Sequence, residues 1–437
     1  MKMRSSRALA LAMGLAAATA LSSQAMAATQ IDFMFPAAVQ GKLAREMQAI
    51  VKDFNDSQSE VEVTGVFAGS YDETKIKSQA AAQAGRPPAV VLMSANFVTE
   101  LWMNDQITPV ADYMKKAGVD PKAFIDEFWP AVRPNATIDG TLYAIPFQNS
   151  TPILYYNKDQ FKEAGITRPP ETWSEWVADA KKLTRPGGKR WGLMMPSNYD
   201  YNGWLVQTLA MSNGSQFFNL AYPGEVYYDT PSTRGALKFW RDLAHVDKVM
   251  PTGVTSSKQV STAFFSGQAS MIVLSTGALS FVRENAKFDY GVAFIPRNVR
   301  NAVPIGGASL VSFKGLSEAQ QQAAWTFMAY LSSPEILGRW SRFTGYFAPR
   351  RTAYDLPEMQ DFVKQHPDAL RAVQQLEHAQ PWLATYNTVA VRKAVEDQMQ
   401  ALLSDPDLPV AEAVRKAQAK ADEIMRPYVE KTADGLM

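Results

Sequence analysis

The chain has 437 residues, with 44 basic against 43 acidic side chains and no cysteine. This near-neutral balance provides no electrostatic footprint for nucleic acid, so we expect no nucleic-acid partner. The absence of cysteine excludes disulfides and a lipid anchor on an N-terminal cysteine, so a large hydrophobic core must stabilise the fold.

The N-terminus has the pattern of a secretory signal peptide. Basic residues at positions 2, 4 and 7 precede an apolar run over residues 8–21, and Ala25 and Ala27 frame an A-x-A cleavage site. The run is shorter than the roughly 20 residues that a membrane-spanning helix needs. We expect residues 1–27 to be cleaved off after Ala27 and the mature chain to be periplasmic. An uncleaved N-terminal anchor is the alternative.

Strand and helix patterns alternate in the next part of the chain. Apolar alternation and short apolar runs predict strands at residues 29–35, 61–67 and 88–93. Apolar residues at helical spacing predict helices at 41–55 and 72–85. This order is typical of an α/β domain with a parallel sheet.

The remaining chain is richer in helix. Helices are predicted at residues 170–183, 230–246, 317–333, 333–345, 389–404 and 408–431, and a helix-turn-strand unit at 261–275. Two extended, aromatic, proline-ended stretches, 141–147 and 288–296, look like crossings between domains. Two lobes joined by such strands would enclose a cleft that opens and closes about a hinge.

Patterns for catalysis or metal binding are scarce. The three histidines, His245, His366 and His378, do not stand at metal-ligand spacing, and the lack of cysteine effectively excludes a zinc or thiolate site. Neither a G-x-S-x-G elbow nor a P-loop is present. A glycosidase needs only two carboxylates, so that class stays open. We expect no enzyme, no cofactor and no metal.

Several motifs resemble those of the periplasmic solute-binding proteins of ABC importers, the extracellular family 1 group that includes maltose-binding proteins. The wide family is marked by "STPILYYNKDQFKEAGI", "PPETWSEW" and "FSGQASMIV". The closest likeness is to the glycerol-3-phosphate-binding branch, through "AGSYDETK", "NAKFDYGVAFIP", "IGGASL" and "TGYFAPRRTAYD". The resemblance covers nearly the whole mature chain in order.

This resemblance implies a two-lobe α/β fold, each lobe a mostly parallel sheet flanked by helices, with the ligand cleft at the hinge. We expect residues 28–140 and 290–345 in the first lobe. Residues 141–289 and 346–437, including the C-terminal helices, are expected in the second. The implied protein is a monomer that captures a small hydroxylated solute and docks on membrane permease subunits. Glycerol-3-phosphate, a glycerophosphodiester, a sugar and a polyol all stay open as the solute.

The resemblance also implies ligand contacts. Tyr71 of "GSYDE" matches a tyrosine of the family's site, with a core aromatic as the alternative. Ser150 matches one of two ligand-touching serines, and Asn149 replaces the other by an amide; a turn or strand cap is the alternative. Ser275 of "LSTGAL" matches a ligand-facing serine, and a role as helix N-cap is compatible with that contact.

Further matches lie later in the chain. Gly306 and Gly307 of "IGGASL" match glycines whose backbone approaches the ligand, although a glycine pair is often only a turn. Tyr346 of "TGYFAP" matches a tyrosine that reaches the ligand. Trp204 of "YNGWLVQ" falls where the family lines its cleft, with core packing as the competing interpretation. Trp173 of "ETW" is a weaker candidate, because packing within its helix explains it as well.

Two positions depart from the glycerol-3-phosphate branch. The acidic residue that meets the glycerol hydroxyls aligns with Ala95, between Ser94 and Asn96. The arginine that pairs with the phosphate aligns with Leu383. With a shifted alignment that arginine is one of three others, Arg392, Arg350 or Arg351. Arginine pairs strongly and specifically with phosphate, so the ligand depends on whether one of them reaches the cleft.

Two other functions stay open from the sequence. The chain could be a secreted carbohydrate-active hydrolase, which turnover of a glycoside or phosphodiester would reveal. It could instead be a ligand-sensing subunit for a chemoreceptor, which uses the same fold without an importer.

Overall fold

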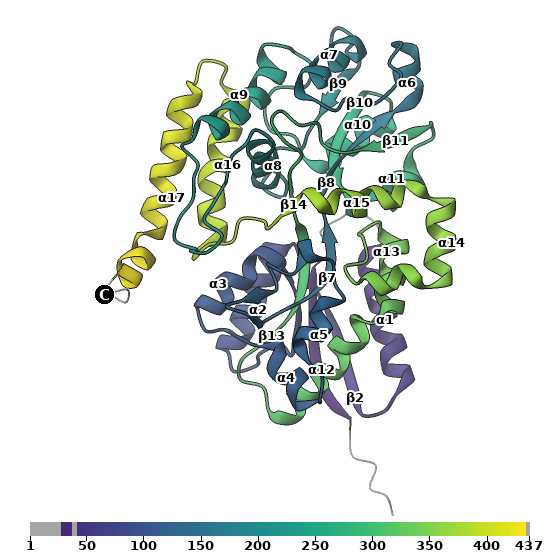
Figure 1. Cartoon of the computed structure of the whole chain (residues 1–437), viewed down its shortest axis with the longest axis vertical. Coiled ribbons are helices and arrows are strands. Elements are labelled where there is room, and N and C mark those ends of the chain that lie inside the picture. The colour runs from purple at the N-terminus through teal and green to yellow at the C-terminus, as the bar shows by residue number, and fades with distance from the viewer. Residues whose placement is uncertain (1–27, 37–41, 434–437) are drawn as a thin grey trace, which may run out of the picture.

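The computed structural model describes residues 28–36 and 42–433, so the predicted signal peptide lies outside the described residues. The chain forms two lobes, one above the other in Figure 1, and each lobe is built on a sheet flanked by helices. Within the described ranges, no helix is long and apolar enough to cross a membrane. The two-lobe α/β architecture expected from the sequence is therefore confirmed.

The lower lobe in Figure 1 contains, over the described residues, a six-stranded sheet in the order β2-β1-β3-β13-β4, with β7 also pairing with β13. Its strands are β1 (Thr29–Pro36), β2 (Val61–Gly69), β3 (Val90–Ser94), β4 (Ile107–Thr108), β7 (Ile145–Ser150) and β13 (Gly306–Phe313). Strand β1 is parallel to β2 and β3. Strand β13 is antiparallel to β3, β4 and β7.

The upper lobe contains a four-stranded sheet, counted over the same described part of the chain, in the order β11-β8-β10-β9. Its strands are β8 (Pro152–Asn157), β9 (Trp191–Met194), β10 (Ala269–Ser275) and β11 (Tyr290–Ala293). Strand β8 is antiparallel to both neighbours, and β9 is parallel to β10. Both sheets are thus mixed rather than mostly parallel, because β13 and β8 enter their lobes from the other lobe and run against their neighbours.

Helices cover the faces of both sheets. Those of the lower lobe are α1 (Leu43–Ser57), α2 (Tyr71–Gln83), α3 (Val98–Met103), α4 (Val110–Lys116), α5 (Pro121–Asp126), α12 (Glu318–Leu331) and α13 (Pro334–Thr344). Those of the upper lobe are α6 (Lys158–Glu163), α7 (Trp173–Leu183), α8 (Asn202–Ser212), α9 (Pro231–His245), α10 (Ser257–Phe265), α11 (Leu279–Asn285), α16 (Thr388–Ser404) and α17 (Val410–Ala433). Helix α15 (Leu370–Gln374) lies at the junction of the lobes, and α14 (Pro357–Gln365) lies beside α13 at the edge of the lower lobe (Figure 1).

The two hydrophobic cores are separate, and they correct the expected domain boundaries. The lower core includes apolar residues of 142–147 and of 346–376, which we had expected in the second lobe. The upper core includes apolar residues of 292–303, which we had expected in the first. The physical reason is strand pairing: β7 is hydrogen-bonded to β13 and β11 to β8, so each stays with its own sheet.

Local sequence explains the elements that carry the cleft. Helix α1 buries the apolar residues whose helical spacing predicts it, Leu43, Met47, Ile50, Val51 and Phe54. Strand β3 is buried along its whole length, as expected for a short apolar strand inside a sheet. The ends of such rigid strands are well suited to hold side chains at a cleft.

Gly307 is a glycine that the fold requires, which yields a stability prediction. Its φ is +92°, and a Cβ there would lie 1.8 Å from the carbonyl oxygen of Gln148 on the paired strand β7. We expect Gly307→Ala to lower the melting temperature strongly, since the backbone of β7 or β13 must move. The matched control is Gly85→Ala, whose φ is +73° but whose Cβ would meet nothing within 4 Å. That change should cost only about 1 kcal/mol from the positive φ. Equal melting temperatures for the two variants would contradict this account.

Candidate functional site

A cavity of about 350 Å³ lies between the two lobes. Its volume is in the range of small-molecule sites. From the lower lobe and the strands that cross to it, the wall takes Phe67, Gly69, Ser70, Tyr71, Asp72, Ser94, Ser150, Gly306, Gly307 and Tyr346. From the upper lobe and the C-terminal region it takes Tyr199, Asp200, Tyr201, Trp204, Ser275, Trp382 and Arg392. A molecule held here would touch both lobes.

A helix cap presents Tyr71 to the cavity. Ser70 and Glu73 form a capping box, in which Ser70 Oγ accepts the Glu73 N–H and the Glu73 carboxylate accepts the Ser70 N–H. This box starts α2 at Tyr71 and leaves the ring in its first turn. The Tyr71 hydroxyl accepts a hydrogen bond from Gln148 Nε2 at 3.0 Å. Burial raises the pKa of Tyr71 to about 12, so the phenol stays protonated and can donate to a ligand oxygen.

Aromatic rings form one side of the cavity. The Trp204 ring centroid lies 6.0 Å from that of Tyr201 and 6.2 Å from that of Trp382. Trp204 Nε1 donates to the Pro304 carbonyl at 3.2 Å, which fixes the indole. A Cβ on Gly306 would lie 2.7 Å from this ring, so glycine lets the ring sit against the β13 backbone. Such faces suit the C–H groups of a sugar or glycerol, or a cation.

Hydroxyl groups stand at the ends of three strands around the cavity. Ser94 ends β3, Ser150 ends β7 and Ser275 ends β10. Ser275 Oγ also accepts the Gly277 N–H at 3.0 Å, so it caps the short turn that follows, as the sequence allowed. Ser94 Oγ donates to Asn96 Oδ1 at 2.8 Å. Ligands of α/β sheets bind at such strand ends.

Arg392 is the cation of the cavity wall. Its side chain is 7% exposed, and its guanidinium stands between carboxylates of two elements, Asp72 of α2 and Glu396 of its own helix α16. Nη2 lies 3.5 Å from Asp72 Oδ2, and Nε lies 3.0 Å from Glu396 Oε1. The guanidinium also lies 5.6 Å from the Trp382 ring centroid. The Asp72 contact is long and Asp72 is half exposed, so a better-placed anion can replace it.

Family membership indicates what this cavity is for. A family model described as "Bacterial extracellular solute-binding protein" matches residues 49–370, which is more than half of the chain. The chain belongs to this family. The family resemblance predicted from the motifs is therefore confirmed, and the chain is the solute-binding component of an ABC importer.

Individual relatives and structures agree with the family. UgpB of Yersinia pseudotuberculosis, named an sn-glycerol-3-phosphate-binding periplasmic protein, is 29% identical over 430 residues, 93% of this chain and 94% of the relative. UgpB of Escherichia coli K12 is 28% identical over 447 residues, covering 97% and 98%. A crystal structure of Mycobacterium tuberculosis UgpB in complex with glycerophosphocholine matches with TM-score 0.82 and 25% identity, over 92% of this chain and 100% of that chain. Maltose-bound MalE3 of T. maritima matches with TM-score 0.79 and 21% identity, over 91% and 100%.

Most of the site residues predicted for this solute-binding protein line the cavity. They are Tyr71, Ser94, Ser150, Trp204, Ser275, Gly306, Gly307, Tyr346 and Arg392. Their contact with a solute stays a prediction.

Three predicted residues do not line it. Asn149 lies in β7 between Gln148 and Ser150, and successive strand residues point to opposite faces, so Ser150 reaches the cavity and Asn149 does not. Asn96 is fully buried and bonded to Ser94. Trp173 stacks on Phe239 at 4.1 Å, which is the packing role weighed against ligand contact.

One of the three arginines considered as phosphate partners lines the cavity. Arg350 pairs with Glu127, and Arg351 donates to the backbone carbonyl of Asp126; neither lines the cavity. Leu383, which aligns with the phosphate-pairing arginine when the alignment is not shifted, donates its backbone N–H to Gln207 Oε1 at 3.0 Å. Only Arg392 of these candidates stands in the wall.

Several lining residues were not predicted. Asp72 follows Tyr71 inside the "AGSYDETK" motif, so its place in the first turn of α2 was a signal that could have been used. Tyr199 to Tyr201 directly precede Trp204, whose motif was recognised. Trp382 had no local signal, because its place depends on how the C-terminal region returns to the cleft.

Among the described residues, no three or more His, Cys, Asp or Glu side chains come together in a group that could hold a metal ion. His245 Nε2 instead contacts the backbone carbonyls of Leu402 and Leu403 at 3.1 and 3.0 Å, which ties α9 to the end of α16.

Proposed function

We propose that this solute-binding protein captures a glycerophosphate-type solute, a phosphate monoester or diester of glycerol, in the cleft between its lobes. The loaded protein then delivers the solute to the permease subunits of the importer. It works as a monomer in the periplasm, after removal of residues 1–27. It performs no chemistry on the solute.

The observation that carries this proposal is Arg392 in the cavity wall. A guanidinium presents donors that match phosphate oxygens, and the buried setting strengthens the pairing. Relatives over nearly the whole chain are named as sn-glycerol-3-phosphate-binding proteins. The neighbouring hydroxyls of Ser94, Ser150 and Ser275 and the phenols of Tyr71 and Tyr346 supply partners for glycerol hydroxyls.

Closure of the two lobes around the solute is expected because both lobes contribute residues to the cavity wall. Tyr71 and Gly307 belong to the lower lobe, whereas Trp204 and Arg392 belong to the upper lobe and its C-terminal helix. A solute that contacts both sets stabilises the closed arrangement over an open one. The closed form is then the one that a permease can recognise.

A neutral sugar is the second candidate, and the carboxylates favour it. Asp72 and Asp200 line the same cavity, and carboxylates commonly accept hydrogen bonds from sugar hydroxyls. The tryptophan faces of Trp204 and Trp382 suit a pyranose ring as well as glycerol.

A thermal-shift screen distinguishes the two candidates, since ligand binding to the native state raises the melting temperature by mass action. We expect glycerol-3-phosphate or glycerophosphocholine to raise the melting temperature, and maltose, glycerol and inorganic phosphate to have little effect. A shift with maltose alone would favour the sugar. Products released from glycerophosphocholine during the same incubation would contradict a pure binding function.

A further inference from the structure

We infer that Glu396 positions Arg392 in the cavity and that a phosphorylated solute binds there together with a proton taken up at Glu396. This inference rests on the proposed function and deepens it. It makes solute affinity depend on pH through a residue that does not itself line the cavity.

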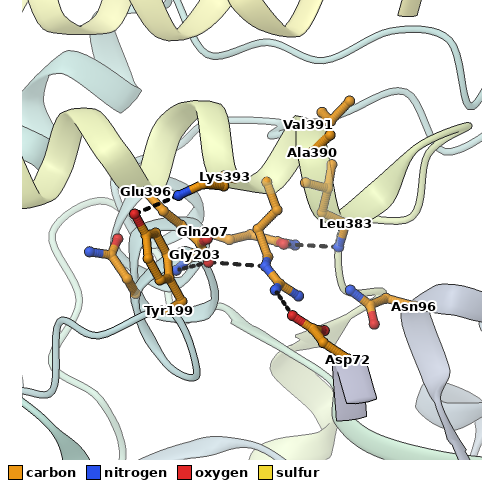
Figure 2. Close-up of polar contacts among 12 residues, drawn as sticks. Asp72, Asn96, Tyr199, Gly203, Gln207, Leu383, Ala390, Val391, Lys393 and Glu396 are labelled. Atoms are coloured by element: carbon orange, nitrogen blue, oxygen red, sulfur yellow. Dashed lines mark hydrogen bonds and ion pairs between the residues drawn. The ribbon is translucent and has the colours of Figure 1, made fainter. Parts of the chain in front are cut away.

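The geometry makes Glu396 a holder of the guanidinium. Its side chain is 1% exposed, and Oε1 lies 3.0 Å from Arg392 Nε, although off the line of a hydrogen bond. The same oxygen accepts the Gly203 N–H of α8 at 3.0 Å (Figure 2). A Cβ on Gly203 would lie 2.6 Å from both the Arg392 Cγ and Glu396 Oε1, so the two helices are in tight contact here. Glu396 and the Gly203 backbone thus hold Arg392 on the side away from the cavity, and the end of its guanidinium faces the cavity.

Charged and polar groups from four parts of the fold surround Glu396. Arg392 and Lys393 belong to its own helix, and Asp72 comes from α2 in the other lobe. Tyr228, just before α9, interacts with Glu396 and donates its hydroxyl to the Val391 carbonyl. Helix α8 contributes the Gly203 N–H. Burial raises the pKa of Glu396 to about 7, and Arg392 and the Gly203 N–H offset only part of that effect.

An anion on Arg392 changes this balance in a defined direction. A phosphate beside the guanidinium competes with Glu396 for its charge and adds a negative charge nearby, and both effects raise the pKa of Glu396. A group whose pKa rises on binding takes up protons, so the complex is favoured at low pH. Affinity is therefore highest below pH about 7, where Glu396 is already protonated, and falls as the pH rises above that value. A neutral solute does not produce this coupling.

Glycerophosphocholine is the best probe, because its phosphodiester carries one negative charge throughout this range, whereas a phosphate monoester has its own pKa near 6. Calorimetric titrations at pH 6, 7 and 8.5, each in two buffers of different ionisation enthalpy, give both affinity and proton uptake. One unit of pKa displacement from about 7 should give an uptake of about 0.4 proton per bound molecule at pH 7, about 0.2 at pH 8.5 and about 0.1 at pH 6. Affinity should fall about tenfold between pH 6 and 8.5, the change that one unit of pKa displacement produces.

Two substitutions separate positioning from titration. Glu396→Gln still presents a carbonyl oxygen to Arg392 but cannot titrate, so its affinity should no longer depend on pH and its proton uptake should vanish. Glu396→Leu keeps the volume without any polar partner, so it should bind at least tenfold more weakly at every pH. Glu412→Gln, an exposed carboxylate on α17, is the matched control and should retain the wild-type pH profile.

Each outcome has one meaning. Equal affinity at pH 6 and 8.5 with no proton uptake in the wild-type protein overturns the inference and leaves the proposed function standing. A pH profile retained in Glu396→Gln also overturns it. If that variant does not fold, a ¹³C NMR titration of the wild-type glutamate carboxyls decides, because no group titrating near pH 7 and shifting upward with glycerophosphocholine would overturn it. Failure of both glycerophosphocholine and glycerol-3-phosphate to bind at any pH overturns the proposed function, and this inference with it.

Discussion

Replacing Arg392 by alanine is expected to reduce affinity for a glycerophosphate-type solute by about 30- to 100-fold, equivalent to about 2–3 kcal/mol. The side chain is the cation of the cavity wall and is nearly inaccessible to water, so its pairing with phosphate is weakly screened. Isothermal titration measures the change. Affinity for a neutral sugar, if any exists, should change much less, since only the charged interaction is removed.

Two further variants serve as controls for Arg392→Ala. Arg415→Ala removes an exposed arginine from α17 and should leave affinity unaltered. Arg392→Lys keeps the charge but not the planar donor pair, so it should recover only part of the loss. Unchanged affinity in Arg392→Ala, with a melting temperature showing that the variant is folded, would place the phosphate elsewhere.

The largest stability effect is expected at Lys75, which forms a buried ion pair with Glu100 in the lower lobe. Glu100 also accepts the backbone N–H of Thr388 at 3.1 Å, so it anchors the first turn of α16, the helix that carries Arg392. Lys75→Met leaves this carboxylate buried without its cation. We expect a loss of about 3–5 kcal/mol, as found when one partner of a buried pair is removed. A urea-unfolding midpoint reports it.

The control for Lys75 is the double variant Lys75→Met with Glu100→Gln. The amide keeps an acceptor for the Thr388 N–H and removes the unpaired charge, so the double variant should recover most of the stability. Lys52→Met breaks an exposed pair with Asp56 on α1 and should have no measurable effect. A double variant no more stable than Lys75→Met alone would show that the buried charge is not the cause.

The fold was largely predictable because its signals are local. Helix α1 follows from the spacing of its apolar residues, and the alternation of strands and helices up to residue 94 follows from period and breakers. The domain boundaries could not be predicted from such local patterns. Whether residues 145–150 belong to one lobe or the other depends on hydrogen bonds to β13, about 160 residues later in the chain.

The site was predictable only where a motif carried it. Tyr71 and the Gly306-Gly307 pair were recognised because short motifs preserve them. Asn149 was named for its place in a motif. The alternation of a strand instead puts Gln148 and Ser150 on one face, and Gln148 bonds to Tyr71.

The C-terminal part of the site required the structure. Arg392 could be named only as one of three arginines, because the packing of α16 on α8 decides which turn of the helix faces the cavity. Glu396 could not be found from the sequence at all. Its role follows from burial and from the contact with Gly203, nearly 200 residues earlier in the chain.

A crystal structure of the protein grown with glycerophosphocholine would show which residues hold the phosphate. We predict the solute between the lobes, with a phosphate oxygen about 3 Å from the Arg392 guanidinium and Asp72 no longer its partner. The glycerol hydroxyls should meet the serine and tyrosine hydroxyls of the wall. A phosphate bound away from Arg392, with the Asp72 contact intact, would contradict the proposed role of Arg392.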